Sequence, residues 1–181
     1  MSWFEASARV PLLISYPKRF EPGYINHSVS SMDLLPTLVD LVGQTTDPRL
    51  PLDGHSLVPF LEGNGSPRTV YGEYLGEGTV APLMMIRRGP WKFVTCPVDP
   101  PQLFNLDEDP RELTNLATST DATVKQALQA FELEANARWD FKRIHAEVLK
   151  SQRSRKLCWD ALTRGRFQTW DYQPRELASE Q

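Results

Sequence analysis

Long apolar runs are absent from this sequence, and their absence limits where the protein can reside. No stretch approaches the roughly 20 apolar residues that a membrane-spanning helix needs. A signal peptide is not indicated either, because Glu5 and Arg9 interrupt the N-terminus early. We therefore expect a cytoplasmic protein that does not contact a membrane.

Cysteines are few, and neither sign of charge dominates. The two cysteines, Cys96 and Cys158, lie far apart without a Cys-x-x-Cys or metal-binding spacing. We expect both to be reduced thiols, with a stray disulfide as the alternative. The 20 basic and 23 acidic residues give a net charge of −3, so no strong field favours nucleic acid as a partner.

The residues that are present indicate a globular protein with many irregular connections. Hydrophobic residues make up 40% of the 181 positions and charged residues 24%, which is typical of a folded chain. The 15 prolines predict extended, loop-rich connections. The length suits one ordinary domain or two small ones.

An apolar run bounded by prolines, residues 10–16, predicts a buried strand. Such a strand needs neighbours in its sheet and helices over both faces, yet too few partner strands follow it. We therefore expect it to be the last strand of a larger α/β sheet whose earlier part is not in this sequence. Without those neighbours its apolar edge would invite aggregation.

Two helices are predicted next. The first spans residues 33–43, with Asp33 as its N-cap and Gly43 as its C-terminal stop. The second is a short helix within residues 56–61 that Ser56 could cap, and His55 before it is interpreted as a turn residue. The apolar face of the first helix contains Leu34, Leu35, Leu38, Leu41 and Val42.

A small antiparallel sheet is predicted from alternating β-type runs. The runs are residues 69–75, 83–87 and 91–94, with a Gly89-Pro90 turn between the last two and a further strand at 102–106. Glycines flank Glu77 in the loop between the first two runs, so its carboxylate could project from a tight loop. Two readings stay open: a recognition loop, or a surface hairpin with a solvated glutamate.

The last third of the sequence predicts helices and an aromatic tail. One helix is expected from Asp121 and a second from Asp140, and the basic run 150–156 would be a solvated face or a contact with an acidic partner. The acidic residues 107–110 are interpreted as a solvated turn. The tail either packs on its own domain or docks on another chain, and its aromatic faces could also approach a cationic ligand. Its aromatic residues are Trp159, Phe167, Trp170 and Tyr172.

Several phrases, in this order, resemble the C-terminal part of formylglycine-dependent sulfatases. They are residues 4–5, 9–12, 32–38, 52–57, 102–110, Glu112 and 115–117. Within that superfamily, other phrases resemble choline-sulfatases. These are residues 71–79, 85–89, 138–140, 165–167 and 170–171.

The resemblance implies an incomplete α/β fold of the alkaline-phosphatase and sulfatase type. Residues 1–68 would be the end of the catalytic α/β domain, and 69–120 a small antiparallel-sheet subdomain. Residues 121–181 would be a helical region with an oligomerising tail that forms a homo-oligomer.

The activity that the resemblance implies is hydrolysis of choline O-sulfate to choline and sulfate. In that family a modified cysteine attacks the sulfur, and a divalent metal, usually calcium, polarises the sulfate. Neither cysteine here lies in the required Cys-x-Pro/Ala-Ser-Arg phrase, and the family's metal-binding Asp phrase would lie before Met1, so no catalytic residue and no metal ligand is expected in this chain. The chain alone is predicted to be inactive.

The same resemblance suggests Glu77 as the carboxylate that faces the trimethylammonium group. Glu73 is the local competitor, and it could not share the site if it lay on the opposite strand face. Two alternatives stay open for the chain as a whole. It could be a non-catalytic choline-binding or assembly module, or part of a sulfatase or phosphonate-type hydrolase with a different substrate.

Overall fold

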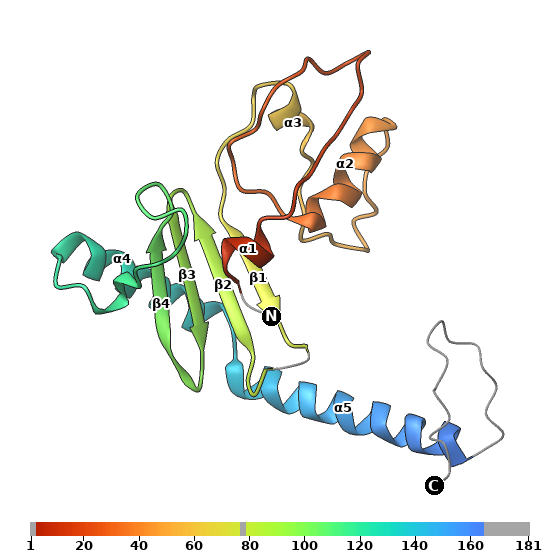
Figure 1. The fold of residues 1–181 in the computed structure, drawn as a ribbon. Helices are drawn as coiled ribbons and strands as arrows, with labels where there is room; N and C mark the ends of the chain where they lie inside the picture. Colours follow the sequence, from red (N-terminus) through yellow and green to blue (C-terminus); the bar gives the residue numbers. More distant parts are fainter. Residues whose placement is uncertain (1–2, 77–78, 165–181) are drawn as a thin grey trace, which may run out of the picture. The chain divides into compact units, whose positions relative to one another are not determined.

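A computed structural model describes residues 3–76 and 79–164 (Figure 1). The chain divides into two compact units, Met1–Phe141 and Lys142–Gln181. The first unit contains a sheet with short helices before it and a longer helix after it. Its helices are α1 (Glu5–Ala8), η1 (Ser31–Asp33), α2 (Leu34–Leu41), α3 (Val58–Leu61), η2 (Leu116–Thr118) and α4 (Ala122–Arg138).

The sheet is a four-stranded antiparallel meander in the order β1-β2-β3-β4. Its strands are β1 (Val70–Tyr74), β2 (Leu83–Arg88), β3 (Trp91–Cys96) and β4 (Asp99–Asn105), which confirms the predicted antiparallel sheet. Gly89 turns the chain between β2 and β3 with a φ of 53°, a conformation that favours glycine. Among the described residues β1 is an edge strand that pairs with β2 alone, from Val70 opposite Arg87 to Tyr74 opposite Leu83.

One face of the sheet packs against α4 and forms the main core of the first unit. Phe131 of α4 stacks on Phe93 of β3 with ring centroids 5.8 Å apart. Met84 and Ile86 of β2 are fully buried, and so is Leu103 of β4. Asp121 caps α4 by accepting hydrogen bonds from two backbone N–H groups of its first turn, so the predicted start of this helix is confirmed.

The other face of the sheet holds three consecutive residues from the start of the chain. The indole of Trp3 donates a hydrogen bond to the carbonyl of Leu83 at 3.0 Å, and its ring lies so close to Gly72 that a Cβ there would clash. Phe4 contacts the ring of Phe104 on β4. Residues 3–5 therefore cross the sheet as an anchor, which Glu5 completes as described below.

Helix α2 confirms the predicted helix and its N-cap position at Asp33, but the Asp33 side chain makes no capping hydrogen bond to α2. Ser30 caps the preceding turn η1, and its N–H donates a hydrogen bond to the Asp33 carboxylate at 2.7 Å. The Asp33 side chain is instead buried, and it accepts further hydrogen bonds from the His55 N–H and from Arg68. The sequence could not indicate this, because Arg68 and His55 lie far from Asp33 along the chain.

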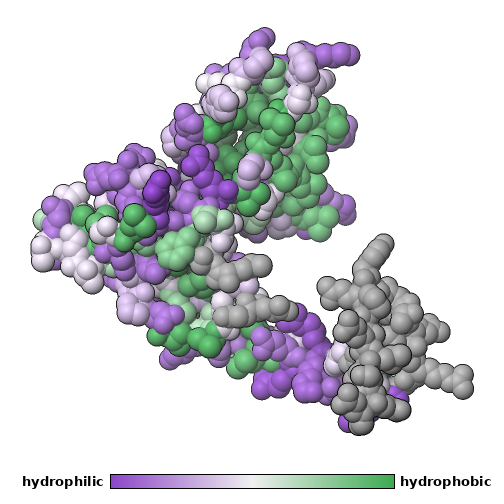
Figure 2. Space-filling model, viewed as in Figure 1, coloured by the Kyte–Doolittle hydropathy of each residue, from purple (hydrophilic) through white to green (hydrophobic). Residues whose placement is uncertain are grey.

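The face that α2 buries also differs from the expected one. Pro36 and Thr37 are buried, and the Thr37 hydroxyl accepts a hydrogen bond from the Leu57 N–H at 2.8 Å. The predicted apolar face is mostly exposed: Leu35 is 54% and Leu38 61% exposed. Figure 2 shows the apolar surface that gathers over this region.

Residues 10–16 do not form the predicted strand. They are irregular, with Leu13 92% and Val10 75% exposed. The physical reason is that a strand requires hydrogen-bonding neighbours, and no described residue pairs with this segment. The apolar pattern is as expected, but among the described residues nothing covers it.

The described part of the second unit is the long helix α5 (Phe141–Arg164), whose first residue is the last residue of the first unit. This confirms the helix predicted from Asp140. None of its described residues is buried, and its basic run is exposed as expected. In the part of the chain that the structure describes, no helix is both long enough and apolar enough to span a membrane.

Candidate functional site

The two glutamates expected near a cationic substrate have different outcomes. Glu77 lies outside the described residues. Glu73 is on β1, and its carboxylate accepts a hydrogen bond from the indole N–H of Trp139 at 2.7 Å. Trp139 follows the last residue of α4 and is buried. Glu73 therefore lies on the face of the sheet that α4 covers, and its carboxylate has a fixed partner there.

Tyr71, two residues before Glu73, is held by the same end of α4. Its hydroxyl donates a hydrogen bond to Glu134 at 2.7 Å, and its ring packs edge-on against Trp139. The Arg138 guanidinium lies 3.7 Å from the centre of the Tyr71 ring, a cation–π contact. β1 is thus fixed along one edge by pairing with β2 and on one face by side chains at the end of α4.

Glu134 is the centre of the charged contacts in this cluster. Arg88 donates two hydrogen bonds to its carboxylate, at 2.7 and 2.6 Å. Burial raises the pKa of Glu134, but the hydrogen bonds from Arg88 and Tyr71 outweigh it and hold the pKa below its usual value. Burial and the contact with Glu134 raise the pKa of Tyr71. The cluster therefore favours a charged Glu134 and a neutral Tyr71.

These contacts bring together two phrases that the sequence left separate. Residues 71–79 and 138–140 both carry the choline-sulfatase resemblance, and their hydrogen bond spans 66 positions. Sequence reasoning gave Trp139 no role. The available signal was a tryptophan directly after the basic end of a helix, which predicts burial but not its partner.

A buried ion cluster on the opposite face was also missed. Lys92 on β3 is 1% exposed, and its Nζ lies 2.8 Å from carboxylate oxygens of both Glu5 and Glu112. The Glu5 N–H donates to Glu112, which has a φ of 56° in the left-handed region that non-glycine residues rarely adopt. Strand alternation could have placed Lys92 on the inner face beside Val94, but not its distant partners.

Arg87 adds a second cationic group to this face. Its Nη1 is buried without a hydrogen-bond partner among the described residues. Burial lowers the pKa of Arg87, while the carboxylates of Glu5, Asp107 and Glu112 act in the opposite direction. The ion cluster therefore balances positive and negative groups, and it ties residues 3–5 to the sheet rather than presenting a reactive group.

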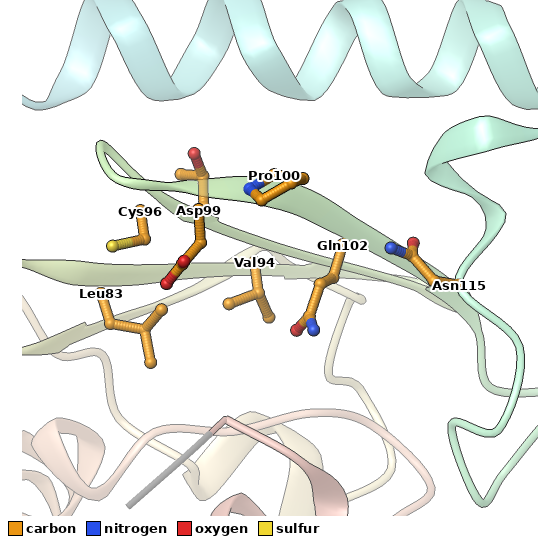
Figure 3. A pocket seen from close by; sticks show the side chains of 8 residues that line it. Leu83, Val94, Cys96, Asp99, Pro100, Gln102 and Asn115 are labelled. Carbon is orange, nitrogen blue, oxygen red and sulfur yellow. The ribbon is translucent and has the colours of Figure 1, made fainter. Parts of the chain in front are cut away.

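A shallow pocket of about 390 Å³ opens near the turn between β3 and β4 (Figure 3). The Cys96 thiol and the Asp99 carboxylate lie on its wall next to Leu83 and Val94. Asn115 at its edge already accepts a hydrogen bond from Leu103 and donates one to Pro101. Thr95 and Gln102 also line the pocket, but no described residue in its lining is a histidine or lysine that could act as a base beside the thiol.

The remaining expectations concern the tail, the cysteines and metals. Trp159 on α5 is 51% exposed, whereas Phe167, Trp170 and Tyr172 lie outside the described residues. Cys96 and Cys158 are both free, as expected. Among residues 3–76 and 79–164, no group of three or more His, Cys, Asp or Glu side chains could hold a metal ion.

Comparison with known proteins places the chain among sulfatases. The family described as N-sulphoglucosamine sulphohydrolase, C-terminal, matches residues 2–137, and the family described as choline sulfatase enzyme C terminal matches residues 146–181. The choline-sulfatase of Rhizobium meliloti (strain 1021) is 44% identical over 99% of this chain and 35% of its own length. The arylsulfatase K of Gallus gallus is 35% identical over 69% of this chain and 25% of its own.

A solved structure of a 2-O GAG sulfatase superposes on 58% of this chain and 23% of its own, with a TM-score of 0.49 and 27% identity. The chain spans about a third or less of the length of these relatives. The family match agrees with the predicted fold class, together with the four-stranded antiparallel sheet and the C-terminal helices of the structure. The chain therefore belongs to the sulfatase family and corresponds to the C-terminal part of a choline-sulfatase-like member.

Proposed function

We propose that this chain is the C-terminal part of a sulfuric ester hydrolase that converts choline O-sulfate and water to choline and sulfate. The observation that carries the proposal is the 44% identity to choline-sulfatase, which extends over 99% of the chain. The match of residues 146–181 to the choline sulfatase C-terminal family supports it separately, because the other family match ends at residue 137.

Within such an enzyme, this chain would supply recognition of the choline end of the substrate. We propose Glu77 as the carboxylate that attracts the trimethylammonium group. That cation cannot donate a strong hydrogen bond, so the attraction would be Coulombic and would strengthen as water is excluded. Glu73 is less suited to direct contact, because its carboxylate already accepts the Trp139 indole N–H.

The reactive groups would lie in the part of the relatives that this chain does not match. The described residues do not provide a metal site, so we derive no step through a metal. Calcium, if it is the ion, would be held by residues outside this chain. The exposed apolar residues of α2 and of residues 10–16 support this division, since a catalytic α/β domain would cover them.

The C-terminal region would supply contacts between subunits of a homo-oligomer. Helix α5 has no buried residue, and Leu157, Trp159 and Leu162 on it are more than half exposed. Helices in folded proteins are stabilised mainly by packing an apolar face. The two free thiols favour a reducing compartment such as the cytoplasm for the assembled enzyme.

A chimera tests the proposal directly. The matching C-terminal part of the Rhizobium meliloti choline-sulfatase is replaced by this whole chain, and sulfate release from choline sulfate is measured. We expect the chimera to turn over and the chain alone to be inactive. Glu77→Gln in the chimera should raise the KM for choline sulfate, because a neutral amide cannot attract the cation, while the KM for an aryl sulfate, whose aryl group carries no cation, should be unaffected.

The other interpretations predict different results. A soluble, folded chimera that cleaves aryl sulfates but not choline sulfate would indicate a sulfatase with another substrate, as the arylsulfatase relatives suggest. Choline binding by the chain alone, measured by calorimetry, together with an inactive chimera would indicate a non-catalytic module.

A further inference from the structure

We propose that Trp139 and Glu73 act as a pair of positioning residues for the substrate-binding edge of the sheet, and that Glu73 is not itself a ligand of the cation. The proposal rests on the proposed function, choline recognition next to β1. It assigns a role to the phrase 138–140, which the catalytic scheme of sulfatases does not use.

The geometry places this pair where it controls an otherwise weakly held strand. β1 is an edge strand, so hydrogen bonds fix it on one side only. Glu73 lies opposite Met84, one position before the final pair of Tyr74 and Leu83. The Trp139 indole therefore holds β1 within one residue of the point where its pairing ends, and the described chain continues into Leu75 and Gly76.

The end of α4 is itself fixed, which makes it a suitable reference point. Trp139 is 4% exposed, and its backbone N–H donates to the Ala135 carbonyl at 2.9 Å. A second contact lies two residues before Glu73 on β1, where the Arg138 guanidinium is 3.7 Å from the centre of the Tyr71 ring. A buried indole has one N–H donor, and a charged acceptor makes that hydrogen bond stronger than a neutral one.

The Glu73 carboxylate points to the face of the sheet that α4 covers, where it accepts the indole N–H. Contact with a cation on the opposite face would require breaking that hydrogen bond. We infer that Glu73 works through strand placement, so its acceptor oxygen matters more than its charge.

Substitutions that separate acceptor from charge test this in the chimera described above. Trp139→Phe removes the N–H and keeps an aromatic ring, Glu73→Ala removes the acceptor, and Glu73→Gln keeps an acceptor oxygen without the charge. We expect the first two to raise the KM for choline sulfate roughly three- to tenfold with kcat nearly unchanged, as lost uniform binding does. Glu73→Gln should stay within about twofold of the parent, since its oxygen still accepts the indole N–H.

A double-mutant cycle and a packing control separate positioning from general stability. The double variant, Trp139→Phe with Glu73→Ala, should be no worse than the poorer single variant, because both remove one interaction. The control is Phe131→Leu, which weakens the packing of α4 on Phe93 of β3 and on Arg88 of β2 but keeps the Trp139 indole and the Glu73 carboxylate. It should lower the melting temperature and leave the KM unchanged.

Three results would overturn the proposal. A Glu73→Gln variant as impaired as Glu73→Ala, with Trp139→Phe unaffected, would make Glu73 a direct cation ligand. Equal KM values for Trp139→Phe and the parent, or an equal rise in KM for Phe131→Leu, would leave Trp139 as ordinary core. A parent chimera without activity on choline sulfate would refute the proposed function as well, and it is recognised before any variant is made.

Discussion

The sheet with α4 and the earlier segment, residues 3–69, differ in how far their apolar residues are buried. In the sheet, Met84, Ile86 and Leu103 are completely buried. In the earlier segment, Leu13 is 92% and Leu38 61% exposed although both sit in apolar patterns. The sheet covers its own core with α4. The earlier segment has apolar faces on two elements and, among the described residues, no cover for either.

Both regions also bury charged groups, which are Lys92 and Glu112 at the sheet and Asp33 in the earlier segment. The earlier segment is held together around Asp33, which is 2% exposed and accepts hydrogen bonds from the Ser30 and His55 N–H groups. It also buries Phe20, Leu57, Val58 and Phe60, whereas Leu13, Leu35 and Leu38 are exposed. The comparison shows that one chain can contain a region that buries its own apolar core and a second region whose apolar residues stay exposed. The second region has buried polar contacts, but no described residue covers its apolar faces.

Loss of the buried lysine should have the largest effect on stability. Lys92→Met leaves the buried Glu112 carboxylate and the half-buried Glu5 carboxylate without their lysine partner, and removing one partner from such a cluster costs about 3–5 kcal/mol. Urea unfolding of the full chain should show this loss. Adding Glu5→Gln and Glu112→Gln should recover much of the lost stability. A Lys92→Met variant as stable as the parent would show that the ion cluster does not stabilise the fold.

Disruption of the Asp33 centre should have the next largest effect. Asp33→Ala leaves the Ser30 and His55 N–H groups and the Arg68 guanidinium without their acceptor, so we expect a loss of about 2–4 kcal/mol. Asp47→Ala is the matched control, because Asp47 binds only its exposed neighbour Arg49. If both variants unfold at the same urea concentration, the earlier segment does not depend on a polar framework.

The contact between β1 and α4 should weaken at both ends of the pH scale. The pKa of Glu134 is lowered from its ordinary 4.5, so its contribution is present above pH 4.5 and lost as the pH falls through the folded-state value. The pKa of Tyr71 is raised from 10.0, so its contribution is present below pH 10 and lost as the pH rises further. Glu134→Gln should flatten the acid limb of melting temperature against pH, with Glu108→Gln as the exposed control.

Substitution of the exposed leucines should have the smallest effect on the stability of the chain alone. Leu13→Asp and Leu38→Asp remove no buried contact, so each should change the free energy of unfolding by less than about 0.5 kcal/mol while raising solubility. In the chimera, however, the same changes should block assembly of the active enzyme. Leu113→Asp, at a residue 79% exposed, is the control that should be harmless in both settings. An active Leu13→Asp chimera would mean that this face needs no cover.

The sequence by itself determined the local elements of this protein. Short β-type runs predicted the strands, the Gly89-Pro90 pair predicted the turn between β2 and β3, and the spacing of Phe131 and Ala135 predicted α4. Each of these signals comes from residues a few positions apart, and backbone preference and burial act at that range. The ordered phrases also identified the sulfatase family, which the comparisons confirm.

Only the tertiary structure decided how residues far apart combine. Pattern alone predicted a strand at residues 10–16 and a buried leucine face on α2, but burial depends on which surfaces are present to cover them. The partners of Lys92 and Asp33, and the hydrogen bond from Trp139 to Glu73 across 66 positions, depend on how the chain returns on itself. Local backbone preferences do not determine these long-range contacts, because the free energy that stabilises them comes from packing the whole unit.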